Sequence, residues 1–360
     1  MSASNDSAPG LPWRRDVAEI EAGLQLWARR TESSATVTDV RVPGNGMAND
    51  TALFQLSGEA LVARMAPLPD SPCATFPTFD LTLQHRVIEL VRSRTEVPVP
   101  RVVHYEASSE WLGSPFLVFE AVEGVVAADN PPYVLDPGGW FRKGTPEQWS
   151  QLETATIEVL AAIHDLDDTG GELDFLRPAA PGNTLVEQHL ASQRSYYEWA
   201  RNGIRVPVLE RALDALVTTL PAANSAVLNW GDSRPGNIIY RQFEPVAVLD
   251  WEMAAVGTRE FDVAWATFFH KFFAFLGRQF GLPAGPELFE PSVASEIYKR
   301  ASGQELDDLT WYEAFAGLRF GSILARMSLR NVAFGIQRMP GDGNELMMFA
   351  PLLEELLQAL

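Results

Sequence analysis

The chain has 360 residues, of which 46% are hydrophobic and 21% are charged, so we expect a globular protein with a large apolar core. Its 28 lysines and arginines against 47 aspartates and glutamates give a formal charge of −19, which disfavours nucleic acids and anionic membranes as partners. No run of about 18 apolar residues occurs, so no membrane-spanning helix is expected.

The N-terminal segment and the cysteine usage favour a cytoplasmic protein. Residues 1–12 are polar and small and lack the apolar core of a signal peptide. Cys73 is the single cysteine, so no intrachain disulfide can form, which is typical of a reducing compartment. Because Cys73 lies in a proline-rich stretch, we interpret it as an ordinary loop thiol.

The first third of the chain predicts five strands and one helix. The strand segments alternate in polarity or are rich in β-branched residues, and turn signals separate the first three. They cover residues 35–42, 51–56, 60–65, 101–105 and 116–122. Apolar side chains that recur at helical spacing predict a helix over 80–94, and Pro98 and Pro100 follow it.

After Gly124 the pattern becomes mostly helical. The sequence Thr145-Pro146-Glu147-Gln148 is a capping box that opens a helix to about residue 165. Further helices are expected at 184–202, 206–219, 260–280, 286–301, 309–334 and 344–359. Three short strands are expected at 226–229, 237–240 and 246–249. The pattern predicts an α+β chain with an N-terminal lobe over 1–122 and a helical C-terminal lobe over 123–360.

Polar residues at the ends of these short strands carry the chemical information. Asp232, Asn237 and Asp250 each follow or begin an apolar strand, where a rigid backbone can bring side chains together. Phosphoryl transfer needs a carboxylate to orient a hydroxyl, oxygen ligands for Mg²⁺, and cations near the phosphates. We therefore predict Asp232 as the base and Asn237 and Asp250 as metal ligands. Arg234 would neutralise the moving phosphoryl group, and Glu252 would assist the metal through a water.

The spacing of these residues resembles that of a known enzyme family. Asp-x-Arg-Pro-x-Asn followed by Asp-Trp-Glu resembles the catalytic segments of the protein-kinase-like superfamily. The longer pattern Trp-Gly-Asp-x-x-x-x-Asn, Leu-Asp-Trp-Glu-x-Ala and Gly-x-x-x-x-Asp resembles the aminoglycoside phosphotransferase family. This resemblance implies a two-lobe kinase-like fold with a small antiparallel sheet, ATP and Mg²⁺ as cofactors, and a hydroxyl acceptor. It also implies that Asp262 braces the catalytic loop.

The resemblance extends to a nucleotide site in the N-terminal lobe. The loop 46–51 resembles the family's phosphate-covering loop, and residues 115–124 resemble the strand and hinge that bind adenine through backbone groups. Arg64 occupies the place of the usual phosphate-binding cation, since no lysine lies in the first 142 residues. The predicted nucleotide-binding residues are Gly46, Ala48, Asn49, Thr51, Arg64, Gln84, Glu120 and Val122.

Two further departures from the family pattern accompany Arg64. Gln84 stands where a glutamate usually pairs with the cation, and Glu89, one turn on, offers a substitute. Trp230 stands where a histidine usually precedes the glycine of the catalytic loop, and we expect it to change packing rather than chemistry. These departures keep an alternative open, namely a nucleotide-binding pseudokinase that acts as a sensor or scaffold.

The acceptor is expected to bind in the C-terminal lobe. Aromatic residues gather in the predicted helices there, and we expect at least half of them to be core residues: Tyr196, Tyr197, Trp199, Trp311, Tyr312 and Phe320. The family resemblance implies an aminoglycoside, an amino alcohol or a hydroxyacyl-CoA. The segment 196–201 most resembles the branch joined to acyl-CoA dehydrogenases, so antibiotic resistance is not predicted. A protein acceptor is disfavoured because 250–262 has no long activation-loop-like segment.

Overall fold

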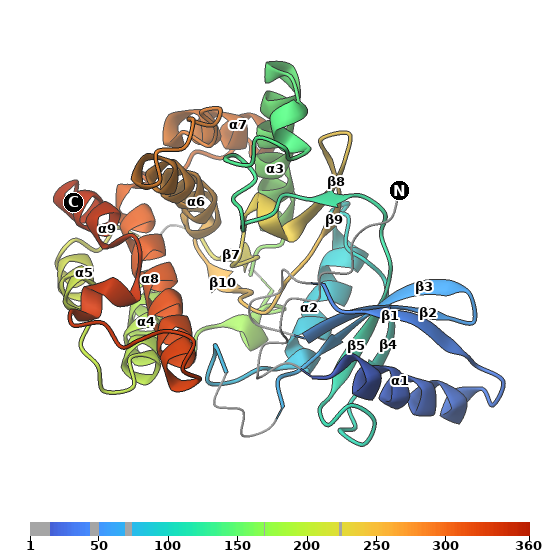
Figure 1. Cartoon of the computed structure of the whole chain (residues 1–360). Helices are drawn as coiled ribbons and strands as arrows, with labels where there is room; N and C mark the ends of the chain where they lie inside the picture. The colour runs from blue at the N-terminus through green and yellow to red at the C-terminus, as the bar shows by residue number, and fades with distance from the viewer. Residues whose placement is uncertain (1–14, 44–49, 69–73, 169, 223–224) are drawn as a thin grey trace.

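The structure is a computed structural model that describes residues 15–43, 50–68, 74–168, 170–222 and 225–360. A five-stranded antiparallel sheet forms the N-terminal part, in the order β1-β2-β3-β5-β4. Its strands are β1 (Val37–Arg41), β2 (Asp50–Leu56), β3 (Glu59–Met65), β4 (Val102–Glu106) and β5 (Phe116–Glu120). Figure 1 shows this sheet on one side of the molecule, with α1 against it, and the helices that follow residue 145 on the other side.

The two faces of the sheet have different partners. Because successive side chains of a strand point to opposite faces, Leu61, Ala63 and Met65 of β3 share one buried face. Helix α1 (Val17–Thr31) covers that face, and the same apolar cluster includes its residue Leu24. Arg64 is therefore directed to the opposite face, which is where the predicted nucleotide site requires a cation.

Helix α1 was not predicted from the sequence. Its apolar residues Ile20, Leu24 and Trp27 recur at helical spacing, and Asp16 caps it by accepting a hydrogen bond from the Ala18 N–H at 2.8 Å. That periodicity was the available signal for the helix. The described residues of the N-terminal part therefore include α1 besides the predicted α2 (Leu81–Arg94).

Helix α2 joins the sheet to the helical part of the chain. Its residues Val87, Ile88 and Val91 are buried in the same apolar core as the C-terminal helices. Figure 1 shows α2 between the sheet and the rest of the molecule. One apolar core therefore extends from α2 into the helical part, while the face of the sheet beneath α1 has a separate core.

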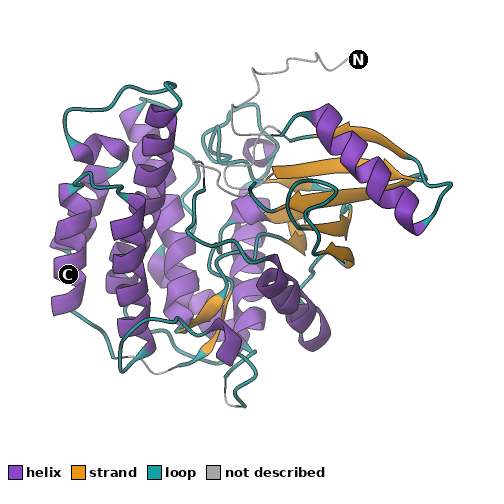
Figure 2. Ribbon diagram, turned by 90° about the horizontal axis from the view of Figure 1, so that it is seen from below, coloured by secondary structure: helices purple, strands orange, loops and turns teal. Residues whose placement is uncertain are grey.

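The C-terminal part is mostly helical, as predicted, and Figure 2 shows its helices gathered away from the sheet. Its helices are α3 (Pro146–His164), α4 (Leu185–Ala200), α5 (Pro207–Thr218), α6 (Arg259–Gln279), α7 (Pro291–Ser302), α8 (Thr310–Ala333) and α9 (Ala350–Gln358). No helix among the described residues is long and apolar enough to span a bilayer.

Helices α7 and α9 begin later than predicted, and proline explains both boundaries. The N-cap Glu290 accepts hydrogen bonds from Ser292 and Val293, and Pro291 occupies the first turn of α7. Proline also lies in the first turn of α9, where only the 3₁₀ turn Gly343–Leu346 precedes it. Proline disfavours helical backbone at the residue before it, so both helices start next to their prolines.

Two small sheets lie between these helices. Strands β8 (Ile238–Arg241) and β9 (Glu244–Val248) form the predicted hairpin, and β6 (Val125–Val126) adds to its edge. Strand β7 (Val227–Asn229) pairs with β10 (Ala255–Gly257). The short strands β6 and β10 were not predicted. Pairing of β10 with β7 brings the chain after Asp250 back beside the chain that leads to Asp232.

Replacement of Leu24 by alanine tests whether α1 is part of the folded core. Leu24 is fully buried against the sheet, so Leu24→Ala should lower the free energy of unfolding by about 2–5 kcal/mol. Leu26 of the same helix is 60% exposed, and Leu26→Ala is the matched control with an effect near zero. Urea titration measures both, and equal effects would mean that α1 is not docked on the sheet.

Candidate active site

The loop from Trp230 to Asn237 connects β7 to β8 through a sharp turn. Gly231 has a φ of +92°, and a Cβ there would lie 2.1 Å from the carbonyl oxygen of Met253. This position therefore requires glycine. The turn lets the loop pass closely beside the segment that follows Asp250.

Asp262, near the start of α6, holds this loop in place. Its carboxylate accepts hydrogen bonds from the backbone N–H groups of Trp230 at 2.7 Å and Gly231 at 2.9 Å. The hydroxyl of Ser233 donates to the Asp262 carbonyl at 2.8 Å. Asp262 is buried, so water competes little for these bonds. The structure thus shows the bracing that the resemblance implied for Asp262.

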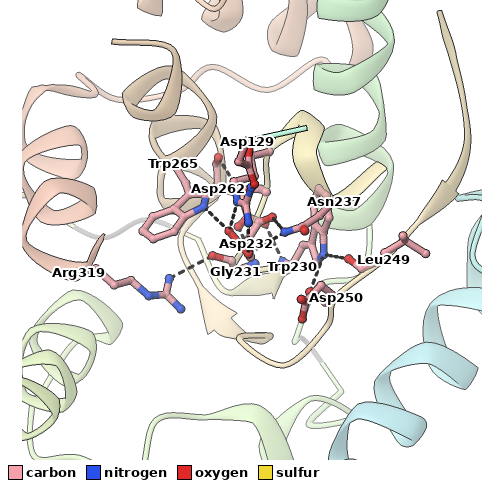
Figure 3. Close-up of polar contacts among 12 residues, drawn as sticks. Asp129, Trp230, Gly231, Asp232, Asn237, Leu249, Asp250, Asp262, Trp265 and Arg319 are labelled. Carbon is pink, nitrogen blue, oxygen red and sulfur yellow. Dashed lines mark hydrogen bonds and ion pairs between the residues drawn. The ribbon is translucent and has the colours of Figure 1, made fainter. Parts of the chain in front are cut away.

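The carboxylate of Asp232 lies at the centre of a hydrogen-bond network (Figure 3). Its Oδ1 accepts from Trp265 Nε1 and from Arg234 Nε, each at 2.8 Å, and its Oδ2 accepts from Asn237 Nδ2 at 2.7 Å. Burial raises the pKa of Asp232, but Arg234 and these hydrogen bonds outweigh burial and hold the pKa below its usual value. Asp232 is therefore ionised and tightly oriented at neutral pH.

Arg234 is engaged by two carboxylates. Besides Asp232, it pairs with Asp129, and its guanidinium lies 5.0 Å from the ring centroid of Phe269. Burial opposes its charge, yet the two carboxylates raise its pKa above the usual range. Asp129 was not a predicted site residue, because its sequence context carries no motif. One of its oxygens, Oδ1, is buried and has no partner among the described residues.

Trp230 links the loop of Asp232 to the loop of Asp250. Its indole Nε1 donates to the carbonyl oxygens of Leu249 at 2.8 Å and Asp250 at 3.1 Å. Asp250 has a φ of +60°, a left-handed conformation that aspartate tolerates better than most residues. Trp230 is fully buried, which agrees with the expectation that it changes packing at the histidine position.

Arg64 reaches from β3 to the loop that follows β9. Its Nη2 pairs with Asp250 Oδ1 at 2.6 Å and with Glu252 Oε2 at 3.1 Å. Burial opposes the charge of Arg64, but Asp250 and then Glu252 more than offset it, so its pKa is raised. Arg64 is on the expected strand and face. Glu89, which the sequence offered as a substitute partner for Arg64, is exposed. The ion-pair partners of Arg64 are instead Asp250 and Glu252.

The three predicted metal residues line one cavity with Asp232. Asn237, Asp250 and Glu252 all border a cavity of about 160 Å³. Asn237 donates its amide N–H groups to the Asp232 side chain and carbonyl, which leaves its Oδ1 as the free acceptor. Among the described residues, no group of three or more His, Cys, Asp or Glu side chains could hold a metal ion. The oxygen set nevertheless suits Mg²⁺, which takes few protein ligands and keeps waters.

A second, mostly apolar cavity of about 480 Å³ lies between the sheet and the β8–β9 hairpin. Five predicted nucleotide residues border it, namely Thr51, Arg64, Gln84, Glu120 and Val122. Gly46, Ala48 and Asn49 lie outside the described residues, as does Cys73. The Glu120 carboxylate accepts from the Arg101 N–H at 3.0 Å, so this side chain is turned toward the neighbouring strand. Asp250 borders both this cavity and the one beside Asp232.

A third cavity of about 550 Å³ adjoins the cavity of Asp232. It shares Phe76, Glu252, Met253 and Ile323 with the Asp232 cavity. Of the six aromatic residues considered for the acceptor, Tyr196, Trp199 and Phe320 border these two cavities. The other three, Tyr197, Trp311 and Tyr312, are buried core residues. This split agrees with the expectation that at least half of them pack in the core.

One face of α6 carries two site residues, Trp265 and Phe269, that were not predicted from the sequence. They lie three and seven residues after the predicted Asp262, so all three face the same side of the helix. All three contact the loop 230–237. The spacing from Asp262 was the signal that could have found Trp265. Arg319, which donates to the Gly231 carbonyl at 3.3 Å, comes from the distant helix α8 and had no sequence signal.

Replacing Trp230 by phenylalanine tests the link between the two loops. Trp230→Phe leaves the partly buried Leu249 and Asp250 carbonyls without this donor, which should cost about 1–3 kcal/mol of unfolding free energy. Trp149→Phe is the matched control, since Trp149 Nε1 also donates to a backbone carbonyl, that of Phe141, at 2.8 Å, away from the site. Urea unfolding and ADP release measure the effects. Turnover should fall only in Trp230→Phe; equal turnover in both variants would contradict the link.

Known proteins resemble this chain over most of its length. A mouse protein, acyl-CoA dehydrogenase family member 10, is 26% identical over 305 residues, which are 80% of this chain and 26% of that protein. The chain spans about a quarter to two fifths of the length of such curated relatives.

Solved structures share the fold. Aminoglycoside phosphotransferase APH(4)-Ia, solved with AMP-PNP and hygromycin B, has a TM-score of 0.57 and 16% identity, covering 94% of this chain and 98% of that chain. Macrolide 2'-phosphotransferase MphH from Brachybacterium faecium has a TM-score of 0.55 and 16% identity, covering 91% and 98%. The predicted kinase-like α+β fold is thus confirmed. The model of the phosphotransferase enzyme family, APH, matches residues 39–290. This chain belongs to that phosphotransferase enzyme family.

Proposed function

We propose that the protein transfers the γ-phosphoryl group of ATP, with Mg²⁺, to a hydroxyl group of a small molecule. The observation that carries the proposal is the arrangement of three adjoining cavities around Asp232 and Asp250. Asp250 borders both the apolar cavity and the cavity of Asp232, which is where a terminal phosphate would lie. The third cavity opens from the Asp232 side and offers room for an acceptor.

Asp232 acts as the base in this proposal. Its carboxylate is ionised, and three side-chain donors, from Trp265, Arg234 and Asn237, hold it in one orientation. Such a carboxylate accepts a hydrogen bond from the acceptor hydroxyl, orients the oxygen toward the phosphorus atom, and takes the proton as the bond forms. Arg234 holds Asp232 in position and places positive charge beside the transferred group.

Asn237, Asp250 and Glu252 would hold Mg²⁺, the last through a water. When bound, the ion neutralises phosphate charge and orients the phosphates for in-line transfer. Asp250 and Glu252 pair with Arg64 in this structure. In the proposal Arg64 exchanges these carboxylates for the α- and β-phosphates, which its planar fork suits.

The nucleotide base would occupy the apolar cavity beside β5. Backbone groups from Glu120 to Val122 would bind adenine, and the loop with Gly46, Ala48, Asn49 and Thr51 would cover the phosphates. Gln84, which is buried on α2, would contact Arg64. We place the boundary between the nucleotide-covering lobe and the acceptor lobe at residues 122 and 123.

The relatives support the choice of ATP and a small hydroxyl acceptor. APH(4)-Ia was solved with AMP-PNP and hygromycin B together, which are an ATP analogue and a small hydroxyl compound. The similarity to acyl-CoA dehydrogenase family members favours a hydroxyacyl-CoA over an amino alcohol or an aminoglycoside. A cytoplasmic location is part of the same proposal, since ATP is abundant there.

One observation favours a second candidate function. The ion pairs of Arg64 with Asp250 and Glu252 occupy the groups that would bind phosphates and metal. A nucleotide sensor without transfer activity could keep such pairs. It would bind ATP equally well with and without Mg²⁺ in thermal-shift measurements and release no ADP. The proposed kinase binds Mg·ATP more tightly and hydrolyses it slowly without an acceptor.

Replacing Asp232 by asparagine tests the proposed base. Asp232→Asn should lower kcat for ADP release by about 10²–10⁴-fold because the acceptor hydroxyl loses its carboxylate. Asp214→Asn, an exposed change on α5, is the matched control and should leave kcat unchanged. Thermal shift with Mg·ATP should be retained in both variants. An unchanged kcat in Asp232→Asn would remove Asp232 from the role.

A further inference from the structure

Arg319 of α8 borders the third cavity, next to the catalytic loop. Its Nη1 donates to the Gly231 carbonyl at 3.3 Å, and its guanidinium lies 5.1 Å from the ring centroid of Trp265. Figure 3 shows Arg319 extending from its helix toward Gly231, below Trp265. A guanidinium has five N–H donors, so one hydrogen bond leaves most of its donor capacity unused.

The other charged side chains that border the two acceptor-side cavities all lie in ion pairs. Asp129 and Asp232 pair with Arg234, while Asp250 and Glu252 pair with Arg64. Within the part of the chain that the structure describes, no carboxylate lies within ion-pair distance of Arg319. Among the described residues that border these two cavities, Arg319 is therefore the charged side chain without an ion-pair partner.

The groups around Arg319 do not replace a counter-ion. His189 also borders the third cavity, and burial lowers its pKa to about 4, so it is neutral at pH 7. Burial likewise lowers the pKa of Arg319, which the more distant Asp232 and Asp262 only partly oppose. A cation kept in such a place without a partner costs free energy unless an anion binds it.

We propose that the acceptor carries an anionic oxygen group, a carboxylate or a phosphate, that binds to Arg319 while its hydroxyl meets Asp232. This inference rests on the proposed function and narrows the acceptor class for the same site to a hydroxy acid or a hydroxyalkyl phosphate, in place of the hydroxyacyl-CoA, whose thioester carbonyl carries no charge. Trp265 contacts both Asp232 and Arg319, since its Nε1 donates to the Asp232 carboxylate and its ring packs against the Arg319 guanidinium. Because the indole ring of Trp265 lies between Asp232 and Arg319, its width sets the distance between the anionic group and the reacting hydroxyl of the acceptor. A cationic group at this position would meet Arg319 with like charge.

Paired acceptors test this proposal. ADP release is measured with a homologous series of straight-chain hydroxy acids and with their neutral methyl esters, and with glycerol 3-phosphate against glycerol. The anionic member of a pair should have a kcat/KM higher by roughly 10- to 100-fold, the effect of a charged hydrogen bond, with an optimum chain length. The hydroxy acids and glycerol 3-phosphate distinguish a carboxylate from a phosphate as the group bound.

Variants of Arg319 separate anion binding from a structural role. Arg319→Gln should raise KM for the anionic acceptors by roughly 10- to 100-fold and leave the neutral ones unchanged, and Arg319→Lys should restore part of the loss. Arg300→Gln, at an exposed site on α7, is the control. An arginine that only supports Gly231 would instead lower kcat for all acceptors alike, which would overturn the proposal. Equal use of charged and neutral acceptors would overturn it as well.

Direct binding measurements test the anion site independently of kinase activity. A hydroxy acid and inorganic phosphate are titrated into the wild type and Arg319→Gln by calorimetry. Binding that the substitution abolishes supports the anion site even where no ADP is released, a result that would count only against the proposed kinase activity. Failure of both anions to bind the wild type, or binding that Arg319→Gln leaves unchanged, would overturn the anion site.

Discussion

The site depends on the hydrogen bonds that the buried carboxylate of Asp262 accepts from the backbone of the neighbouring loop. This carboxylate accepts hydrogen bonds from two consecutive backbone N–H groups, those of Trp230 and Gly231, and so ties the loop 230–237 to the start of α6. His164 also lies 3.2 Å from this carboxylate, within the same buried network. A buried carboxylate is stable only when donors surround it, so the loop and the helix hold each other in one arrangement. Asp232 follows Gly231 directly along the chain, so the same hydrogen bonds fix its position.

Further contacts hold the neighbouring side chains in place. On α6, Trp265 donates a hydrogen bond to Asp232, and the ring of Phe269 packs against the guanidinium of Arg234. Across the hairpin, Trp230 joins the loop of Asp250 through two hydrogen bonds. The sheet then contributes Arg64, which connects β3 to Asp250 and Glu252. Each carboxylate at the site has a cation or a set of N–H groups beside it. These partners offset the free-energy cost of removing several charged groups from water.

The sequence was informative where the relevant residues are near one another along the chain. Asp232 and Asn237 lie five residues apart, and Asp250 lies two residues after the paired strand β9, so the hairpin itself brings them to one cavity. The alternation of β3 placed Arg64 on the correct face for the same local reason. Helix α1 was missed although its periodicity was present.

Contacts between remote segments could not be predicted in the same way. Asp129 pairs with Arg234 across 105 residues, and Arg319 meets Gly231 across 88. Neither residue has a local pattern, because its role depends on how α8 and the segment after β6 pack against the loop. The expected partner for Arg64 was sought on α2, yet the cation turned to the loop after β9, where two carboxylates compensate a buried charge better than one glutamine.

The central claim is that Asn237 and Asp250 share one divalent cation beside Asp232. A crystal structure with Mg²⁺ and a non-hydrolysable ATP analogue tests it most directly. We expect Mg²⁺ at about 2.1 Å from Asn237 Oδ1 and an Asp250 oxygen, with Arg64 moved to the phosphates. A bound nucleotide with Asp250 still paired to Arg64, and no metal between Asn237 and Asp250, would contradict the account.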